Sequence, residues 1–100
     1  MNKRLEELIV AAGPEAEGCL ENILVELLRA RTKHPDWPSD PVHASAVINE
    51  EAGELTQAAL DFYYSCTTED DMAAECIQTA AMSLRFLMHL HTYRRREQQA

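Results

Sequence analysis

Glycine, proline, cysteine and aromatic residues are all scarce in this chain of 100 residues, which has three glycines, four prolines, three cysteines and six aromatic residues. So little glycine and proline excludes a linker-rich or disordered protein. The odd number of cysteines and the lack of Cys-x-x-Cys spacing argue against a disulfide scaffold or a zinc site, so we expect reduced thiols and a cytoplasmic location. No run reaches the ~20 apolar residues of a membrane helix, and Glu6 and Glu7 come too early for a secretory signal. We expect one soluble domain spanning residues 1–100.

Basic residues are missing from the middle of the chain, because no Lys or Arg lies between Lys33 and Arg85. That interval holds ten acidic residues, and the formal net charge of the whole chain is −8. These acids cannot be neutralised by the usual helical pairs with lysine, so they are either solvated or gathered around a cation. The negative charge also argues against a nucleic-acid partner.

The residues that are abundant predict helices. Ala, Leu, Glu and Gln dominate, and no segment alternates apolar and polar residues as a strand does. Gly13-Pro14 ends a first helix, the prolines of 34–41 interrupt the chain, Asp40 is the expected N-cap of the third helix, and Thr68 that of the fourth. The expected helices cover residues 5–12, 16–33, 41–64 and 69–96.

This pattern predicts an all-α fold, an antiparallel four-helix-type bundle. The third and fourth helices are long and rich in alanine, so they can pack closely as an antiparallel pair joined by a short turn. Their apolar faces are broad for so small a chain. We therefore expect a partner subunit to cover part of them, so that the chain forms an oligomer.

Polar side chains recur at helical spacing on both long helices. Glu51 and Glu54 are three residues apart and share one face, and Asp61 lies within about 20° of the same line. Glu75 and Gln78 repeat this spacing on the next helix, where they can look across at the first pair. Carboxylate and amide oxygens suit Mg²⁺ or Mn²⁺. A single Glu-x-x-Glu pair is more often a solvated helix face, and the second polar pair is what favours a metal site here.

These residues resemble a known family. The run INEEAGEL at 48–55, followed about twenty residues later by ECIQ at 75–78, is similar to the EExxE and ExxD motifs of the MazG-like all-α nucleoside triphosphate pyrophosphohydrolases. The resemblance covers roughly half the chain. It implies a dimeric or tetrameric enzyme that converts a (deoxy)nucleoside triphosphate to the monophosphate and pyrophosphate with Mg²⁺. It also implies Glu51, Glu54 and Glu75 as metal ligands, the residues that the helical spacing selects.

One motif position departs from the family, because Gln78 stands where relatives carry Asp. An amide oxygen can ligate Mg²⁺ but brings no charge, so metal affinity should fall. Three alternatives follow. Gln78 binds the metal through its carbonyl, or a neighbouring acid such as Glu50 or Asp61 compensates, or the site has lost catalysis.

The remaining roles follow from the chemistry of phosphoryl transfer. Glu50 or Glu51 is expected to orient and deprotonate the attacking water. Arg85, seven residues beyond Gln78, and Lys33 are expected to hold phosphate groups. Trp37 can stack on the base, or it can simply pack its loop on the bundle. The expected substrate-binding residues are Arg85, Lys33, Trp37 and Asp61.

Two non-enzymatic functions compete with this hypothesis. The first is a catalytically weakened relative that binds a nucleotide or a protein through the same groove, which Gln78 favours. The second is a structural helical interaction module, in which the three glutamates could be replaced by alanine with no loss other than surface charge.

Overall fold

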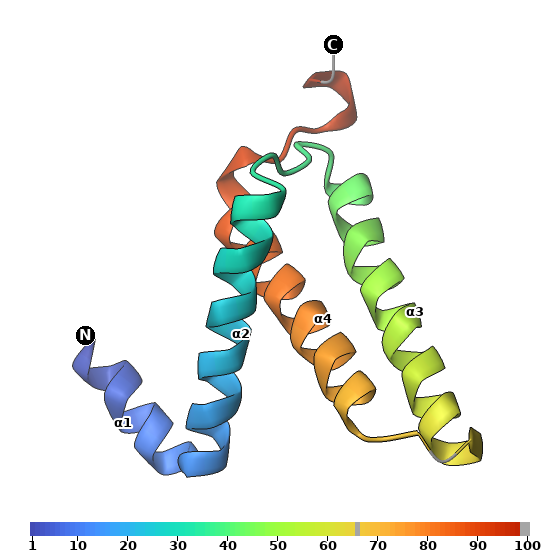
Figure 1. The fold of residues 1–100 in the computed structure, drawn as a ribbon. Helices are drawn as coiled ribbons and strands as arrows, with labels where there is room; N and C mark the ends of the chain where they lie inside the picture. Colours follow the sequence, from blue (N-terminus) through green and yellow to red (C-terminus); the bar gives the residue numbers. More distant parts are fainter. Residues whose placement is uncertain (66, 99–100) are drawn as a thin grey trace.

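The computed structural model describes residues 1–65 and 67–98, and their regular structure is entirely helical. The α-helices are α1 (Lys3–Ala12), α2 (Pro14–Lys33), α3 (Pro41–Ser65) and α4 (Asp70–Met88), followed by the 3-10 helices η1 (Leu90–Thr92) and η2 (Arg96–Gln98) (Figure 1). The predicted all-α fold is thus confirmed for the described residues. None of the helices in this part of the chain combines the length and apolar composition that crossing a membrane requires.

Helix α4 is the centre of the arrangement, because it packs against both α2 and α3. Helices α3 and α4 run antiparallel from the turn that joins them, as the sequence predicts (Figure 1). The 34–40 loop joins α2 to α3 at the end of the molecule opposite the α3–α4 turn, and the C-terminal segment lies at the same end (Figure 1). Among the described residues, helix α1 packs against α2 alone.

Local signals place the starts of the helices. The Asp40 carboxylate accepts hydrogen bonds from the backbone N–H groups of Val42 (2.8 Å) and His43 (3.4 Å), and Pro41 is the first residue of α3. Asp40 is therefore the predicted N-cap. The Thr68 hydroxyl accepts a hydrogen bond from the Asp70 N–H at 3.4 Å, although the cap residue of α4 is Glu69.

Gly13 turns the chain between α1 and α2. Its φ angle is +100°, a conformation that side chains with a Cβ rarely adopt. Its N–H donates to the Ile9 carbonyl at 3.0 Å, which closes the last turn of α1, and Pro14 opens α2. The Gly-Pro pair thus ends one helix and begins the next.

The end of α4 differs from the sequence prediction. The helix ends at Met88 and not near Arg96, because the chain after His89 folds back over the 34–40 loop. The extended residue Tyr93 donates a hydrogen bond from its hydroxyl to the Phe86 carbonyl at 3.1 Å. The Arg94 N–H donates to the Ser39 carbonyl at 2.9 Å. Contacts with a distant loop therefore outweigh local helix propensity.

The core is small and lies mainly between α2 and α4. A cluster of Leu27, Ala30, Ala81 and Met82 is buried there, with Trp37, Val47 and Ile48 among the half-buried residues packed on it. Large apolar side chains on the outside of α2 remain exposed, at 40% for Leu20, 50% for Leu24 and 61% for Leu28. A single copy of the chain leaves this stripe in water.

Replacing the α3 cap should destabilise the fold measurably. We expect Asp40→Ala to lower the free energy of unfolding by about 1 kcal/mol, because two N–H groups of the first turn lose their acceptor. Urea unfolding followed by circular dichroism measures this. Asp40→Asn keeps an acceptor oxygen and should lose much less, and equal losses for the two variants would contradict the capping role.

Candidate metal centre

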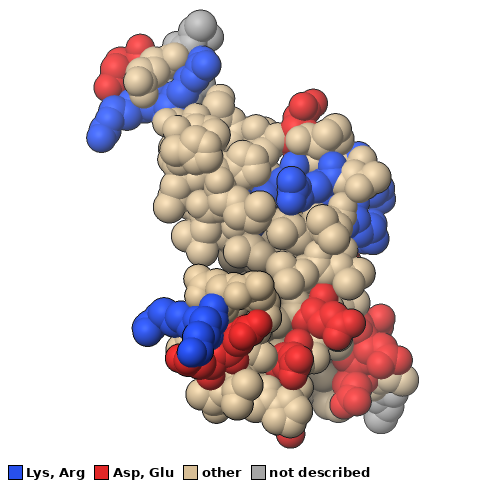
Figure 2. Space-filling view, turned by 90° about the vertical axis from the view of Figure 1, so that its left-hand side faces the viewer, with Lys and Arg blue, Asp and Glu red and all other residues tan. Residues whose placement is uncertain are grey.

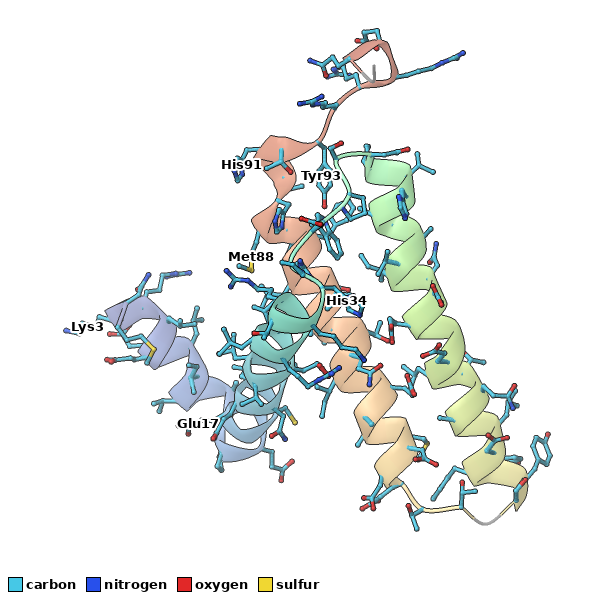
Figure 3. The ribbon with its side chains drawn as sticks, turned by 45° about the horizontal axis from the view of Figure 1, so that its top comes forward. Lys3, Glu17, His34, Met88, His91 and Tyr93 are labelled. Carbon is cyan, nitrogen blue, oxygen red and sulfur yellow. The ribbon has the colours of Figure 1, made fainter. Side chains whose placement is uncertain are left out.

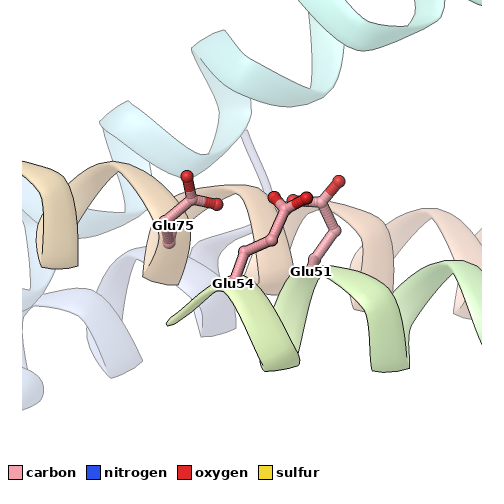
Figure 4. A group of neighbouring side chains, drawn as sticks. All are labelled: Glu51, Glu54 and Glu75. Atoms are coloured by element: carbon pink, nitrogen blue, oxygen red, sulfur yellow. The ribbon is translucent and has the colours of Figure 1, made fainter. Parts of the chain in front are cut away.

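Three glutamates meet between α3 and α4. Glu51 and Glu54 come from adjacent turns of α3 and Glu75 from the facing part of α4, and one carboxylate oxygen of each lies within 4.8 Å of the others (Figure 4). The i,i+3 spacing places the first two side chains on one face. The antiparallel packing of the two helices then brings that face against Glu75. The carboxylates that the sequence analysis selected are therefore neighbours in the fold.

This arrangement is electrostatically unfavourable without a cation. Burial raises the pKa of Glu51, and the negative charges of Glu54 and Glu75 raise it further. Burial also raises the pKa of Glu75, and the adjacent Glu54 carboxylate adds to the effect. One oxygen of Glu51 and one of Glu75 are buried without a hydrogen-bond partner among the described residues. Clustered hard oxygen donors with unsatisfied atoms fit Mg²⁺ or Mn²⁺.

Gln78 lies one turn along α4 from Glu75, and it borders a separate cavity of about 290 Å³. This cavity, which we call the Lys33 hollow, is lined by Glu26, Arg29, Lys33, Glu51 and Gln78 together with neighbouring residues. Glu26 and Arg29 of α2 are site residues that the sequence analysis missed, since an i,i+3 Glu–Arg pair is typical of a solvated helix surface.

The two acids expected to compensate for Gln78 lie near the three glutamates, and their roles stay predictions. Glu50 precedes Glu51 in sequence, and its side chain is exposed. Asp61 borders another hollow with Glu54 and Glu75, and its carboxylate accepts a hydrogen bond from the Gln57 amide at 2.9 Å. Neither acid lines the Lys33 hollow. Asp61 also does not line the cavity that contains Trp37 and Arg85.

That cavity, the Trp37 pocket, has a volume of about 550 Å³ and adjoins the metal centre through Glu51. Its other polar lining groups are His34, Asp36, His43 and Arg85, and its apolar wall includes Trp37. A mostly apolar cavity of this size with a few convergent polar groups is typical of a small-molecule site. Glu51 borders both this pocket and the Lys33 hollow.

Arg85 is buried in the wall of the Trp37 pocket, with 3% of its surface exposed. One terminal nitrogen donates to the carbonyls of His34 (2.7 Å) and Pro35 (3.3 Å), while its Nε has no partner among the described residues. Burial lowers the pKa of Arg85, and the charge of Arg31 lowers it further. Arg85 thus anchors the 34–40 loop, a role that the sequence analysis did not assign to it.

Trp37 is held from three sides. Its indole N–H donates to the Tyr93 hydroxyl at 2.9 Å, its ring stacks on His89 at 5.8 Å between centroids, and the Arg85 guanidinium lies 4.9 Å from its centre. Figure 3 shows His34 at the end of α2 and Tyr93 on the C-terminal segment, near this loop. The packing role weighed for Trp37 is confirmed, and base stacking on its pocket-facing surface stays a prediction.

Charges are unevenly distributed on the surface. On the face shown in Figure 2, many acidic side chains gather in the lower part and one group of basic side chains lies above them, while elsewhere basic and acidic side chains touch. The Lys33 hollow lies where the two meet, since Arg29 and Lys33 line it beside Glu26 and Glu51. An anionic group and a cation could therefore be held side by side there.

Removing one charge from the cluster should stabilise the metal-free protein. A carboxyl pKa that is raised on folding means that stability falls as pH rises from the unfolded pKa through the folded one. We expect the stability of the Glu54→Gln variant to fall less steeply with rising pH, and its melting temperature at pH 7 in EDTA to be higher than that of the wild type. Thermal unfolding between pH 5 and pH 8 measures both effects. Glu21→Gln, at an exposed position of α2, is the control, and equal pH profiles for both variants would contradict the mutual repulsion.

The chain was compared with protein-family models, curated proteins and solved structures, and none of them matched it. The resemblance of residues 48–55 and 75–78 to the MazG-like motifs therefore rests on those residues alone and stays a prediction.

Proposed function

We propose that this protein hydrolyses a nucleoside triphosphate or deoxynucleoside triphosphate to the monophosphate and pyrophosphate, with Mg²⁺ or Mn²⁺ as cofactor. The observation that carries this proposal is the cluster of Glu51, Glu54 and Glu75 beside a pocket large enough for a nucleotide. The motif resemblance supports the same reaction. The fold supports it too, because the facing helices are those that carry the two motifs.

The metal would be held by Glu51, Glu54 and Glu75, with the amide oxygen of Gln78 one turn further along α4. When bound, Mg²⁺ supplies positive charge that offsets the charge developing on the phosphate oxygens. The unpartnered oxygens of Glu51 and Glu75 are the groups that most need such a partner.

Glu51 is a better candidate than Glu50 for the general base. Its carboxylate lines the Trp37 pocket, whereas Glu50 does not. Glu51 would take a proton from water as the water oxygen attacks the α-phosphorus. The bond to the bridging oxygen then breaks, and pyrophosphate leaves.

The substrate would extend across Glu51 from one cavity to the other. The base and sugar would occupy the Trp37 pocket, whose wall includes Trp37 and Arg85. The β- and γ-phosphates would reach the Lys33 hollow, where Lys33 and Arg29 offer positive charge. Asp61, on the opposite side of the cluster, would not contact the base in this arrangement.

Pyrophosphate release from a panel of canonical and modified nucleoside triphosphates tests the reaction. We expect Mg²⁺-dependent release by the wild type, and a fall in kcat/KM of ~10²-fold or more for Glu54→Gln, because a charged group next to the reacting phosphate is lost. Glu17→Gln, exposed on α2, should keep full activity.

The Gln78→Asp variant distinguishes an active pyrophosphohydrolase from a relative that binds nucleotide but has lost catalysis. Activity in this variant and none in the wild type would indicate a nucleotide-binding relative that has lost catalysis. No release from either protein with any substrate would contradict the proposed reaction.

We also propose that a second copy of the chain covers the exposed stripe on α2. Leu20, Leu24 and Leu28 follow one another at four-residue spacing, so they form one continuous apolar ridge. The buried core of one copy is small for a domain of this length. A symmetric helix-to-helix contact would bury the ridge of each copy against its equivalent.

Light scattering coupled to gel filtration measures this association. We expect a dimer or tetramer at micromolar concentration, and a shift toward monomer for Leu24→Glu, because a charge at the centre of the ridge cannot be buried without a partner. A wild type that stays monomeric at micromolar concentration would contradict the proposal.

A further inference from the structure

Glu26 of α2 is an acidic side chain turned inward from a helix surface. Its side chain is 12% exposed, whereas that of Arg29, its ion-pair partner one turn later, is 56% exposed. The Arg29 Nε donates to both carboxylate oxygens of Glu26, at 3.0 and 2.8 Å. The carboxylate therefore sits on the inner side of this pair, and the guanidinium on the solvent side.

The inner side borders the Lys33 hollow, which Glu26 shares with Glu51 of the metal centre. Glu26, Glu51 and Gln78 line this cavity together, one from each of α2, α3 and α4. Glu51 has one oxygen, Oε2, that is buried without a hydrogen-bond partner among the described residues. Carboxylates from two helices that border one cavity can share a cation.

We propose that Glu26 supplies the negative charge that Gln78 does not, as the fourth carboxylate of the metal centre. This inference rests on the proposed metal site. The metal centre would then be built from α2, α3 and α4 and would have four carboxylates. The fourth would come from Glu26 on α2 and not from the α4 position that Gln78 occupies. Arg29 is 56% exposed, so water screens its side of the ion pair, and the Glu26 carboxylate can exchange Arg29 for the metal. Arg29 is then released beside Lys33, in the hollow where we place the leaving phosphates.

Mg²⁺ binding to the full chain, measured by titration calorimetry without nucleotide, tests this assignment. We expect Glu26→Gln to weaken Mg²⁺ binding by roughly 10- to 100-fold. Arg29→Gln should not weaken it, because that variant breaks the ion pair but keeps the carboxylate. Glu21→Gln, exposed on the same helix, is the matched control for the loss of a charge. Circular dichroism establishes that each variant is folded.

Exchanging the carboxylate and the amide between positions 26 and 78 provides the sharpest comparison. Gln78→Asp combined with Glu26→Gln should restore Mg²⁺ affinity to near the wild-type value, because the double variant returns a carboxylate to the same hollow from α4. Failure of this rescue would overturn the assignment, and so would an Arg29→Gln variant that loses as much affinity as Glu26→Gln.

The remaining outcomes separate this inference from the proposed function. If Glu26→Gln binds Mg²⁺ as well as Glu21→Gln while Glu54→Gln loses binding, Glu26 is not a ligand and the three-glutamate centre stands. If the wild type itself does not bind Mg²⁺ or Mn²⁺ at millimolar concentration, the proposed metal centre fails and the role of Glu26 fails with it.

Discussion

The buried guanidinium of Arg85 fixes the geometry on which the candidate site depends. Taking this cation out of water is unfavourable, and its hydrogen bonds to the His34 and Pro35 carbonyls together with the Trp37 ring offset that cost. These contacts hold the 34–40 loop against α4. The loop ends at Asp40, where α3 begins, so it also determines which residues of α3 face α4. Glu51 and Glu54 lie on the helix that starts from this anchored loop, and the packing of that helix on α4 brings them to Glu75.

The two ends of the Trp37 pocket differ in how their buried charges are compensated. At the Arg85 end, a buried charge donates to two backbone carbonyls and lies over the Trp37 ring, which offsets the cost of burying it. At the Glu51 end, like charges are crowded, and one Glu51 oxygen is buried without a partner among the described residues, which destabilises the fold. Folded proteins retain such local conflicts mainly where a site requires them. The pocket joins a cationic wall to an anionic one, which suits a ligand that brings both an anion and a cation.

Features set by neighbouring residues could be predicted from the sequence. Asp40 and Pro41 mark the start of α3 by cap chemistry alone, and the spacing of Glu51 and Glu54 puts them on one face. The end of α4 could not be predicted this way, because Tyr93 is tied to Phe86 and to the distant Trp37. Glu26 could not be predicted as a site residue for a related reason. Its inward direction depends on how α2 packs on α4, and no local pattern encodes that register.

Helix α1 gives the chain an uneven cooperativity. It has no buried residue, it contacts only α2, and Gly13 joins it to α2 through a single residue at positive φ. The free energy needed to open a segment depends on the apolar contacts that it makes, so α1 can detach from α2 without disturbing the packing of α2, α3 and α4. We therefore expect α1 to open at a lower free energy than the three helices that carry the candidate site.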